Sequence, residues 1–124
     1  NLVIGHSSGA VEVLNLLMDG RCPKVTMAVM VGAWAGGLPN SYEEGNPQFI
    51  NLFPKEGFDF EVIKNKAERL AFFHGDNDPY CPLEQAQYLA KNLDASLTVI
   101  PSGGHLGSAL TEVPELWNAI QQSL

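Results

Sequence analysis

Strand-like and helix-like stretches alternate along the whole of this 124-residue chain. Short apolar runs are typical of buried strands, whereas apolar residues spaced three or four apart are typical of one face of a helix. This alternation predicts an α/β fold, in which a parallel sheet carries helices on both faces as three layers. The expected strands cover residues 2–4, 25–31, 69–74 and 96–100, and the expected helices cover 10–18, 59–66, 82–93 and 114–124. A loop-rich insertion, 32–57, follows the second strand.

Composition indicates one domain, because 45% hydrophobic and 17% charged side chains are ordinary for a chain with a single core. In the last helix, Leu116, Trp117, Ile120 and Leu124 are expected to be buried together. The chain opens at Asn1, directly before a buried strand, with no methionine or charged leader. We therefore expect strands to be missing from its N-terminal side.

The charge pattern excludes several classes of partner. A net charge of -7 leaves no basic stripe for phosphate groups, so neither nucleic acid nor an anionic membrane surface is expected as a partner. No apolar run reaches the ~20 residues that a membrane span requires.

Cys22 and Cys81 make no disulfide framework, and no Asn-x-Ser/Thr acceptor occurs, so a reducing cytoplasmic compartment is expected. The sequence does not indicate a protein partner.

A Gly-x-Ser-x-Gly pattern, Gly5 to Gly9, lies between the first strand and the first helix. This is the context of a nucleophile elbow, a sharp turn that exposes a serine hydroxyl at the carboxyl edge of a sheet. Its glycines are expected where side chains would collide with the adjoining strand and helix. Ser7 is then the candidate nucleophile, and Ser8 the candidate helix cap and oxyanion N–H donor. A plain strand-to-helix turn with a serine N-cap would give the same pattern.

An elbow serine needs a histidine base and, usually, a carboxylate that orients it. Asp78 follows the third strand and His105 follows the fourth, so both are expected at the edge that carries Ser7. Asp78 is preferred as the acid because it precedes the turn into the next helix, and Asp76 is the alternative. His74 is interpreted as structural.

The remaining candidates concern the pocket and possible ligands. His6 either packs beside its strand or lines a pocket, and Trp34 and Leu38 in the insertion either fill the core or wall an acyl or aryl pocket. The insertion is thus a surface loop or a small cap. Cys22 and Cys81 lack a companion at metal-ligand spacing, and no nucleotide motif occurs, so no metal or cofactor is expected.

The motifs resemble those of the α/β-hydrolase superfamily, and within it the small serine hydrolases typified by retinoblastoma-binding protein nine. The resemblance covers nearly the whole chain and is carried by residues 4–10, 58–63, 78–82 and 104–105. It implies that Ser7, Asp78 and His105 are nucleophile, orienting acid and general base, in that chain order. It also implies that residues 1–124 are the C-terminal two-thirds of one such domain, and that a second oxyanion N–H comes from an upstream loop.

Taken together, the sequence predicts a serine hydrolase that acts on an ester, thioester or activated amide through an acyl-enzyme. A carboxylic ester is the expected small-molecule substrate. The alternative is a catalytically silent protein-binding domain with the same fold, because fold does not fix function.

Overall fold

The computed structural model describes residues 1–39, 41–107 and 110–123. Within these residues, four parallel strands form one sheet in the order β1 (Leu2–His6), β2 (Val25–Val31), β3 (Ala67–Gly75) and β4 (Ser96–Ile100). The α-helices are α1 (Ser8–Met18), α2 (Phe60–Lys66), α3 (Leu83–Leu93) and α4 (Pro114–Ser123). Two short 3₁₀ helices, η1 (Tyr42–Gly45) and η2 (Pro47–Leu52), lie in the insertion.

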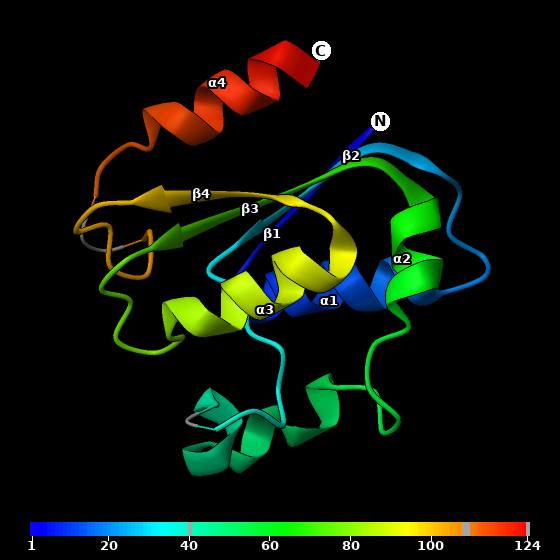
Figure 1. Cartoon of the computed structure of the whole chain (residues 1–124), viewed down its shortest axis with the longest axis horizontal. Coiled ribbons are helices and arrows are strands. Elements are labelled where there is room, and N and C mark those ends of the chain that lie inside the picture. Colours follow the sequence, from blue (N-terminus) through cyan, green and yellow to red (C-terminus); the bar gives the residue numbers. More distant parts are fainter. Residues whose placement is uncertain (40, 108–109, 124) are drawn as a thin grey trace.

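The sheet is the middle of three layers (Figure 1). Helices α1, α2 and α3 lie on one face of it, and α4 lies on the other. The predicted α/β fold with a parallel sheet and helices on both faces is therefore confirmed. Among the described helices, none has the length and apolar character needed to cross a lipid bilayer.

Strand β2 shows how the sequence builds two cores from one sheet. Its side chains alternate in direction, so Ala28 and Met30 pack in the cluster shared with α1, α2 and α3. Met27, Val29 and Val31 belong to the cluster on the α4 face. Because both faces are covered, the strand reads as a continuous apolar run rather than an alternating one.

Helix α4 is less buried than the sequence predicts. Leu116 and Ala119 pack against the second core cluster, but no residue of the helix is fully buried. Trp117 is 58% exposed, so the expectation that it is buried with Leu116 was wrong. Leu124, the last residue of that expected set, lies outside the described residues. The helix contacts the sheet through a narrow face that includes Leu116 and Ala119. Trp117 lies outside that face, so its indole is exposed.

The insertion packs its aromatic side chains around Trp34. The indole makes edge-to-face contacts with Tyr42, Phe49 and Phe53, at ring-centroid distances of 6.1, 5.8 and 5.4 Å. Its N–H donates to the Glu43 carboxylate at 2.9 Å. The insertion thus has a small apolar cluster of its own, which also includes Val11 of α1 and Cys81.

Candidate active site

The carboxyl ends of the four strands bring distant loops to one edge of the sheet. Ser7 follows β1, Asp76 follows β3, and the turn that carries His105 follows β4. Strand register holds these ends level, because His6 pairs with Val31 and Gly75 pairs with Ile100. In parallel α/β sheets this edge is where ligands bind.

The turn at Ser7 has the strained backbone of an elbow. Ser7 adopts φ 59° and ψ -121°, a backbone conformation that residues other than glycine rarely take. A Cβ added to Gly5 would lie 2.1 Å from the Gly9 carbonyl oxygen, so this glycine is required by the close approach of strand and helix. For Gly9 the expectation was wrong within the described residues, because an added Cβ would meet no atom within 4 Å.

The start of α1 also differs from expectation. Ser7, not Ser8, occupies the N-cap position, and its side chain caps no backbone N–H of the helix. Ser8 is the first residue of the helix. Its N–H is one of the first four that an α-helix leaves without an internal acceptor. This N–H therefore remains available beside the Ser7 hydroxyl, at the positive end of the helix dipole.

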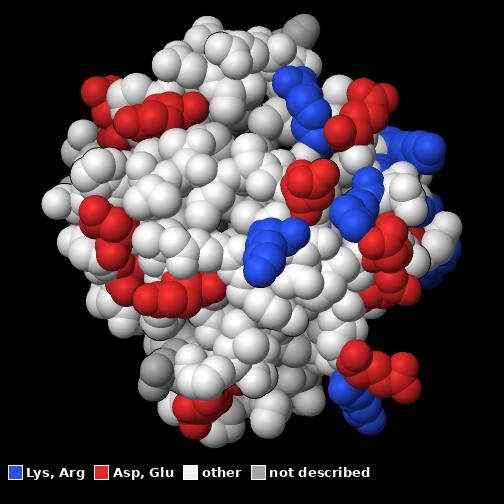
Figure 2. All heavy atoms as spheres, viewed as in Figure 1, with Lys and Arg blue, Asp and Glu red and all other residues white. Residues whose placement is uncertain are grey.

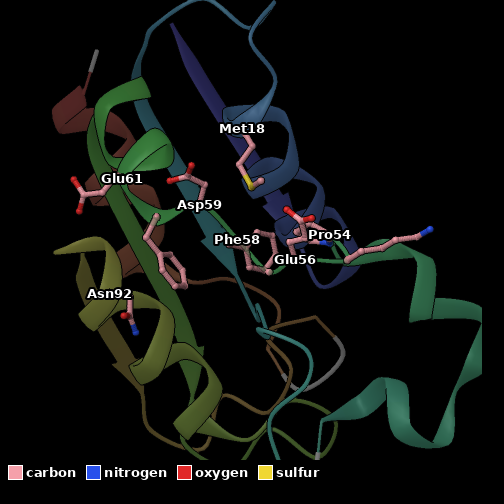
Figure 3. A pocket seen from close by; sticks show the side chains of 10 residues that line it. Met18, Pro54, Glu56, Phe58, Asp59, Glu61 and Asn92 are labelled. Atoms are coloured by element: carbon pink, nitrogen blue, oxygen red, sulfur yellow. The ribbon is translucent and has the colours of Figure 1, made fainter.

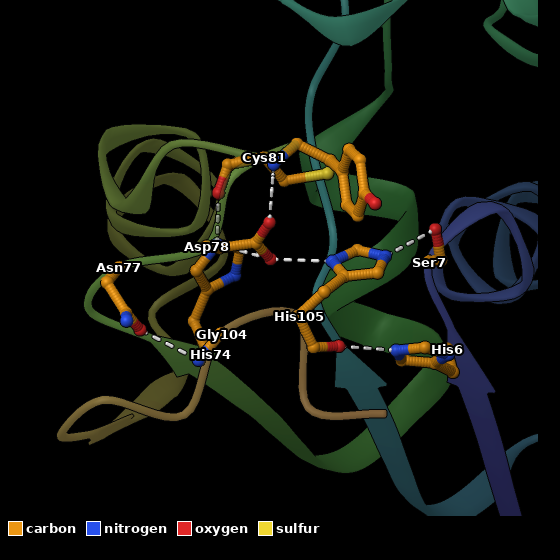
Figure 4. A network of polar contacts seen from close by, with 9 residues as sticks. His6, Ser7, His74, Asn77, Asp78, Cys81, Gly104 and His105 are labelled. Carbon is orange, nitrogen blue, oxygen red and sulfur yellow. Dashed lines mark hydrogen bonds and ion pairs between the residues drawn. The ribbon is translucent and has the colours of Figure 1, made fainter. Parts of the chain in front are cut away.

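A continuous hydrogen-bonded chain joins Ser7, His105 and Asp78 (Figure 4). The His105 Nε2 atom lies 2.8 Å from the Ser7 Oγ atom, and the Nδ1 atom lies 2.6 Å from the Asp78 Oδ2 atom. When Nδ1–H donates to Asp78, Nε2 is left as an acceptor for the Ser7 hydroxyl proton. The folded chain thus brings together three residues that lie up to 98 positions apart.

The two candidate acids have different partners. The second oxygen of Asp78, Oδ1, accepts hydrogen bonds from the backbone N–H groups of Tyr80 at 2.8 Å and Cys81 at 2.9 Å. Asp76 instead accepts from the Ser102 N–H at 2.9 Å, and in the part of the chain that the structure describes it is hydrogen-bonded to no imidazole. The structure therefore brings Asp78 to His105, while Asp76 fastens the loop after β3 to the loop after β4.

The Asp78 carboxylate is buried. Its side chain is 0% exposed, and that of His105 is 15% exposed. Burial alone would raise the pKa of Asp78, but hydrogen bonds from His105, Cys81 and Tyr80 outweigh it and hold this pKa below its usual value. The carboxylate therefore stays ionised at neutral pH, ready to stabilise an imidazolium at position 105.

Two buried groups lie directly behind Asp78. His74 is 0% exposed, and its Nε2–H donates to the Cys81 carbonyl oxygen at 2.6 Å. Burial lowers the pKa of His74, so it is neutral at pH 7 and holds the acid loop through the backbone. The thiol of Cys81 is also 0% exposed, and burial raises its pKa.

The loop after β3 also contacts the turn that carries His105. Asn77 Oδ1 accepts from the Gly104 N–H at 2.7 Å. A Cβ added to Gly75 would lie 2.1 Å from the Gly104 carbonyl oxygen and 2.7 Å from its nitrogen. Only a residue without a side chain lets these two segments approach closely enough to place His105.

We therefore expect Gly75→Ala to destabilise the protein by about 1–3 kcal/mol and to displace His105 from Ser7. Denaturant unfolding and the rate of ester hydrolysis measure the two effects. Gly20→Ala is the matched control, because a Cβ there meets nothing within 4 Å. Equal stability and activity of the two variants would contradict the role given to this close approach.

Sequence reasoning missed Tyr80 and Asn77 beside the imidazole, and left open whether His6 packs beside its strand or lines a pocket. The Tyr80 ring lies edge-on to His105 at a centroid distance of 5.2 Å and is 48% exposed. His6 Nε2–H donates to the His105 carbonyl oxygen at 2.7 Å, so this residue supports the histidine turn from the elbow. Asn77 supports the same turn from the other side. The position of Asn77 directly before Asp78, and of Tyr80 two residues after it, was the available signal.

The two pocket candidates in the insertion have different places. Trp34 is 1% exposed within its aromatic cluster, so it fills the core and forms no open wall. Leu38 is half-buried and borders a hollow of about 400 Å³ beside the start of α3. Both placements follow from the packing of the insertion against α1 and α3, which the sequence pattern does not fix.

A larger hollow lies away from these residues (Figure 3). It has a volume of about 870 Å³ and lies between the end of α1, the end of the insertion and the start of α2. Met18, Phe58 and Asp59 are among its lining residues, and none of Ser7, Asp78 and His105 is. This hollow is therefore no part of the candidate active site.

Comparison with protein families gives a match along nearly all of the chain. The family model described as serine hydrolase matches residues 1–122. The serine hydrolase RBBP9 of Rattus norvegicus is 27% identical over 123 residues, which cover 99% of this chain and 61% of that protein. The protein YdeN of Bacillus subtilis is 24% identical over 121 residues, which cover 95% of this chain and 60% of YdeN. The chain thus spans about 60% of the length of these relatives.

Solved structures show the same fold. The crystal structure of the ydeN gene product of B. subtilis superposes with a TM-score of 0.80 at 22% identity, covering 98% of this chain and 64% of that one. The esterase PE8 superposes with a TM-score of 0.62 at 16% identity, covering 99% of this chain and 50% of that one. The likeness at these identities identifies the fold, which is that of the α/β-hydrolases.

Proposed function

This chain belongs to the serine hydrolase family, and we propose that it cleaves an ester, thioester or activated amide through an acyl-enzyme formed on Ser7. The observation that carries the proposal is the hydrogen-bonded chain from Ser7 Oγ through His105 to Asp78. Distances of 2.8 and 2.6 Å are within the range over which a proton passes directly between such groups.

The first half of the proposed reaction acylates Ser7. His105 Nε2 takes the hydroxyl proton while Oγ attacks the substrate carbonyl carbon, and Asp78 stabilises the imidazolium that results. The Ser8 N–H, free at the start of α1, donates to the oxygen that becomes negative. His105 then gives its proton to the leaving alcohol, thiol or amine, and the acyl group stays on Ser7.

The second half repeats these steps with water. His105 takes a proton from a water molecule, the resulting hydroxide attacks the acyl carbon, and Ser7 leaves with the proton returned by His105. The strained backbone at Ser7 supports this role, because such strain persists where a side chain must be presented in one direction. The ring of Tyr80, 48% exposed and edge-on to His105, supports an acyl or aryl group as the part of the substrate nearest the imidazole.

Surface charge favours an uncharged substrate. In Figure 2 the side of the molecule on which β3 and β4 end shows acidic side chains and no basic ones. Such a surface repels carboxylates and phosphates over about a Debye length, roughly 8 Å at physiological salt. We therefore propose a small neutral ester as the substrate, rather than an acidic one.

Hydrolysis of p-nitrophenyl acetate and butyrate by the intact protein tests this function. Covalent catalysis predicts a burst of p-nitrophenol close to one equivalent per protein molecule when deacylation is the slower half. A matching thioester and anilide then rank the leaving groups. If no ester is hydrolysed faster than by a Ser7→Ala variant, the chain is instead a silent binding domain with the same fold.

A further inference from the structure

Folding brings three metal-ligating side chains together behind Ser7. One ligand atom each from Asp78, Cys81 and His105 lies within 4.8 Å of the other two. In a tetrahedral zinc site with bonds of about 2.0–2.3 Å, neighbouring ligand atoms are about 3.3–3.8 Å apart. Shifts of about 1 Å in the side chains therefore suffice to bring all three onto one ion. The cluster is not apparent from the sequence, because 27 positions separate Asp78 from His105.

The Cys81 thiol has no task in the proposed reaction. It is fully buried, and within the described part of the chain its sulfur takes part in no hydrogen bond. Figure 4 shows the sulfur beside the imidazole of His105 and the carboxylate of Asp78. A thiol at this place completes a Cys-His-Asp ligand set, which suits Zn²⁺.

Charge also fits a divalent cation. A Cys81 thiolate and the Asp78 carboxylate together carry two negative charges, which one Zn²⁺ neutralises with a neutral imidazole as the third ligand. The acidic side chains on this side of the molecule attract a cation (Figure 2). The cluster meets solvent at His105, whose side chain is 15% exposed, while that of Asp78 is fully buried.

We propose that Asp78, Cys81 and His105 form an inhibitory Zn²⁺ site that switches off the Ser7 hydroxyl. Zinc takes the Nδ1 lone pair of His105, and the proton of that nitrogen moves to Nε2. Cys81 releases its thiol proton to solvent, Asp78 exchanges its hydrogen bond for a metal bond, and water fills the fourth position. With a proton on Nε2, His105 accepts none from Ser7, so acylation stops. The inhibition rests on the proposed function, whereas the binding does not.

Zinc binding is measured first, by competition with a chromophoric chelator in the intact protein. We expect one equivalent of Zn²⁺, and a loss of affinity of at least about 100-fold in Cys81→Ser, because a serine hydroxyl is a poor zinc ligand. Cys22→Ser is the matched control: Cys22 is also buried, but its thiol donates to the Pro23 carbonyl oxygen and belongs to another core cluster. If Cys81→Ser does not fold, Cys81→Ala takes its place.

Inhibition is measured next, as the rate of ester hydrolysis or of labelling by a fluorophosphonate at buffered free Zn²⁺. The wild type and Cys22→Ser should lose activity together and recover it with EDTA, and Cys81→Ser should resist at least about tenfold more zinc. Each protein is compared with its own zinc-free rate. Equal zinc sensitivity of Cys81→Ser and the wild type would overturn the site, as would a wild type that binds no zinc.

Ser7→Ala separates this proposal from the proposed function. Ser7 is no zinc ligand here, so Ser7→Ala should still bind one equivalent with unchanged affinity. A protein that binds zinc through Cys81 but hydrolyses nothing would refute the hydrolase and keep the metal site. A protein that hydrolyses esters but does not bind zinc would refute the metal site and keep the hydrolase.

Discussion

Ser7→Ala should lower ester hydrolysis by on the order of 10⁶-fold and leave the fold intact, because it removes the atom that attacks the substrate. The expected loss is large since the nucleophile and its base act as a unit, and His105 has little to activate once Oγ is absent. Activity is measured with p-nitrophenyl butyrate, and the fold is checked by circular dichroism and denaturant unfolding.

Ser8→Ala is the matched control for this experiment. It changes the neighbouring serine but keeps the backbone N–H at the start of α1, which is the group that the mechanism uses there. We expect Ser8→Ala to retain activity within about tenfold of the wild type, a margin far smaller than one oxyanion donor is worth. A result in which Ser8→Ala is inactive and Ser7→Ala active would reverse the assignment of the nucleophile.

Asp78→Asn should lower turnover by on the order of 10⁴-fold, because an amide at this place no longer holds His105 in the tautomer with Nε2 free. The buried carboxylate also stabilises the imidazolium, and a neutral amide does not. The substitution keeps the size of the side chain, so the loss reports on chemistry rather than on packing.

Asp76→Asn is the corresponding control, two residues away in the same loop. Within the described residues its carboxylate accepts the Ser102 N–H alone, so the variant should cost about 1 kcal/mol of stability and less than tenfold in turnover. Steady-state kinetics of both variants, with unfolding curves beside them, measure the difference. Equal losses of turnover would refute Asp78 as the orienting acid.

The sequence predicts the elements best where the local pattern is strong. Residues 25–31 and 96–100 form strands with the expected bounds, because each is an apolar run ended by glycine or proline. Strand β3 begins at Ala67, two residues before the prediction. Glu68 is polar and exposed, so it interrupts the apolar run, yet Ala67 and Arg69 on either side of it pair with β2. The apolar residues of α4 recur at the expected helical spacing. That spacing does not indicate which of them contact the sheet, and Trp117 is exposed.

The candidate site was predictable where chain order and strand ends determine it. Ser7, Asp78 and His105 each follow a strand, and parallel strands bring their carboxyl ends to one edge. The environment of these residues was not predictable in the same way. An aromatic residue after a strand suits a core as well as a pocket, and only the packing of the insertion places Trp34 in the core. The proximity of Cys81 to His105 likewise depends on tertiary structure.

Labelling of the intact protein by a fluorophosphonate, followed by mass spectrometry of its peptides, tests the central claim most directly. The reagent reacts only with a serine whose proton is taken by a base, so it reports activation of the hydroxyl without a known substrate. We predict close to one equivalent of label on Ser7, and none in Ser7→Ala. A folded wild-type protein that takes up no label, or takes it up at another residue, would contradict the assignment of Ser7 as an activated nucleophile.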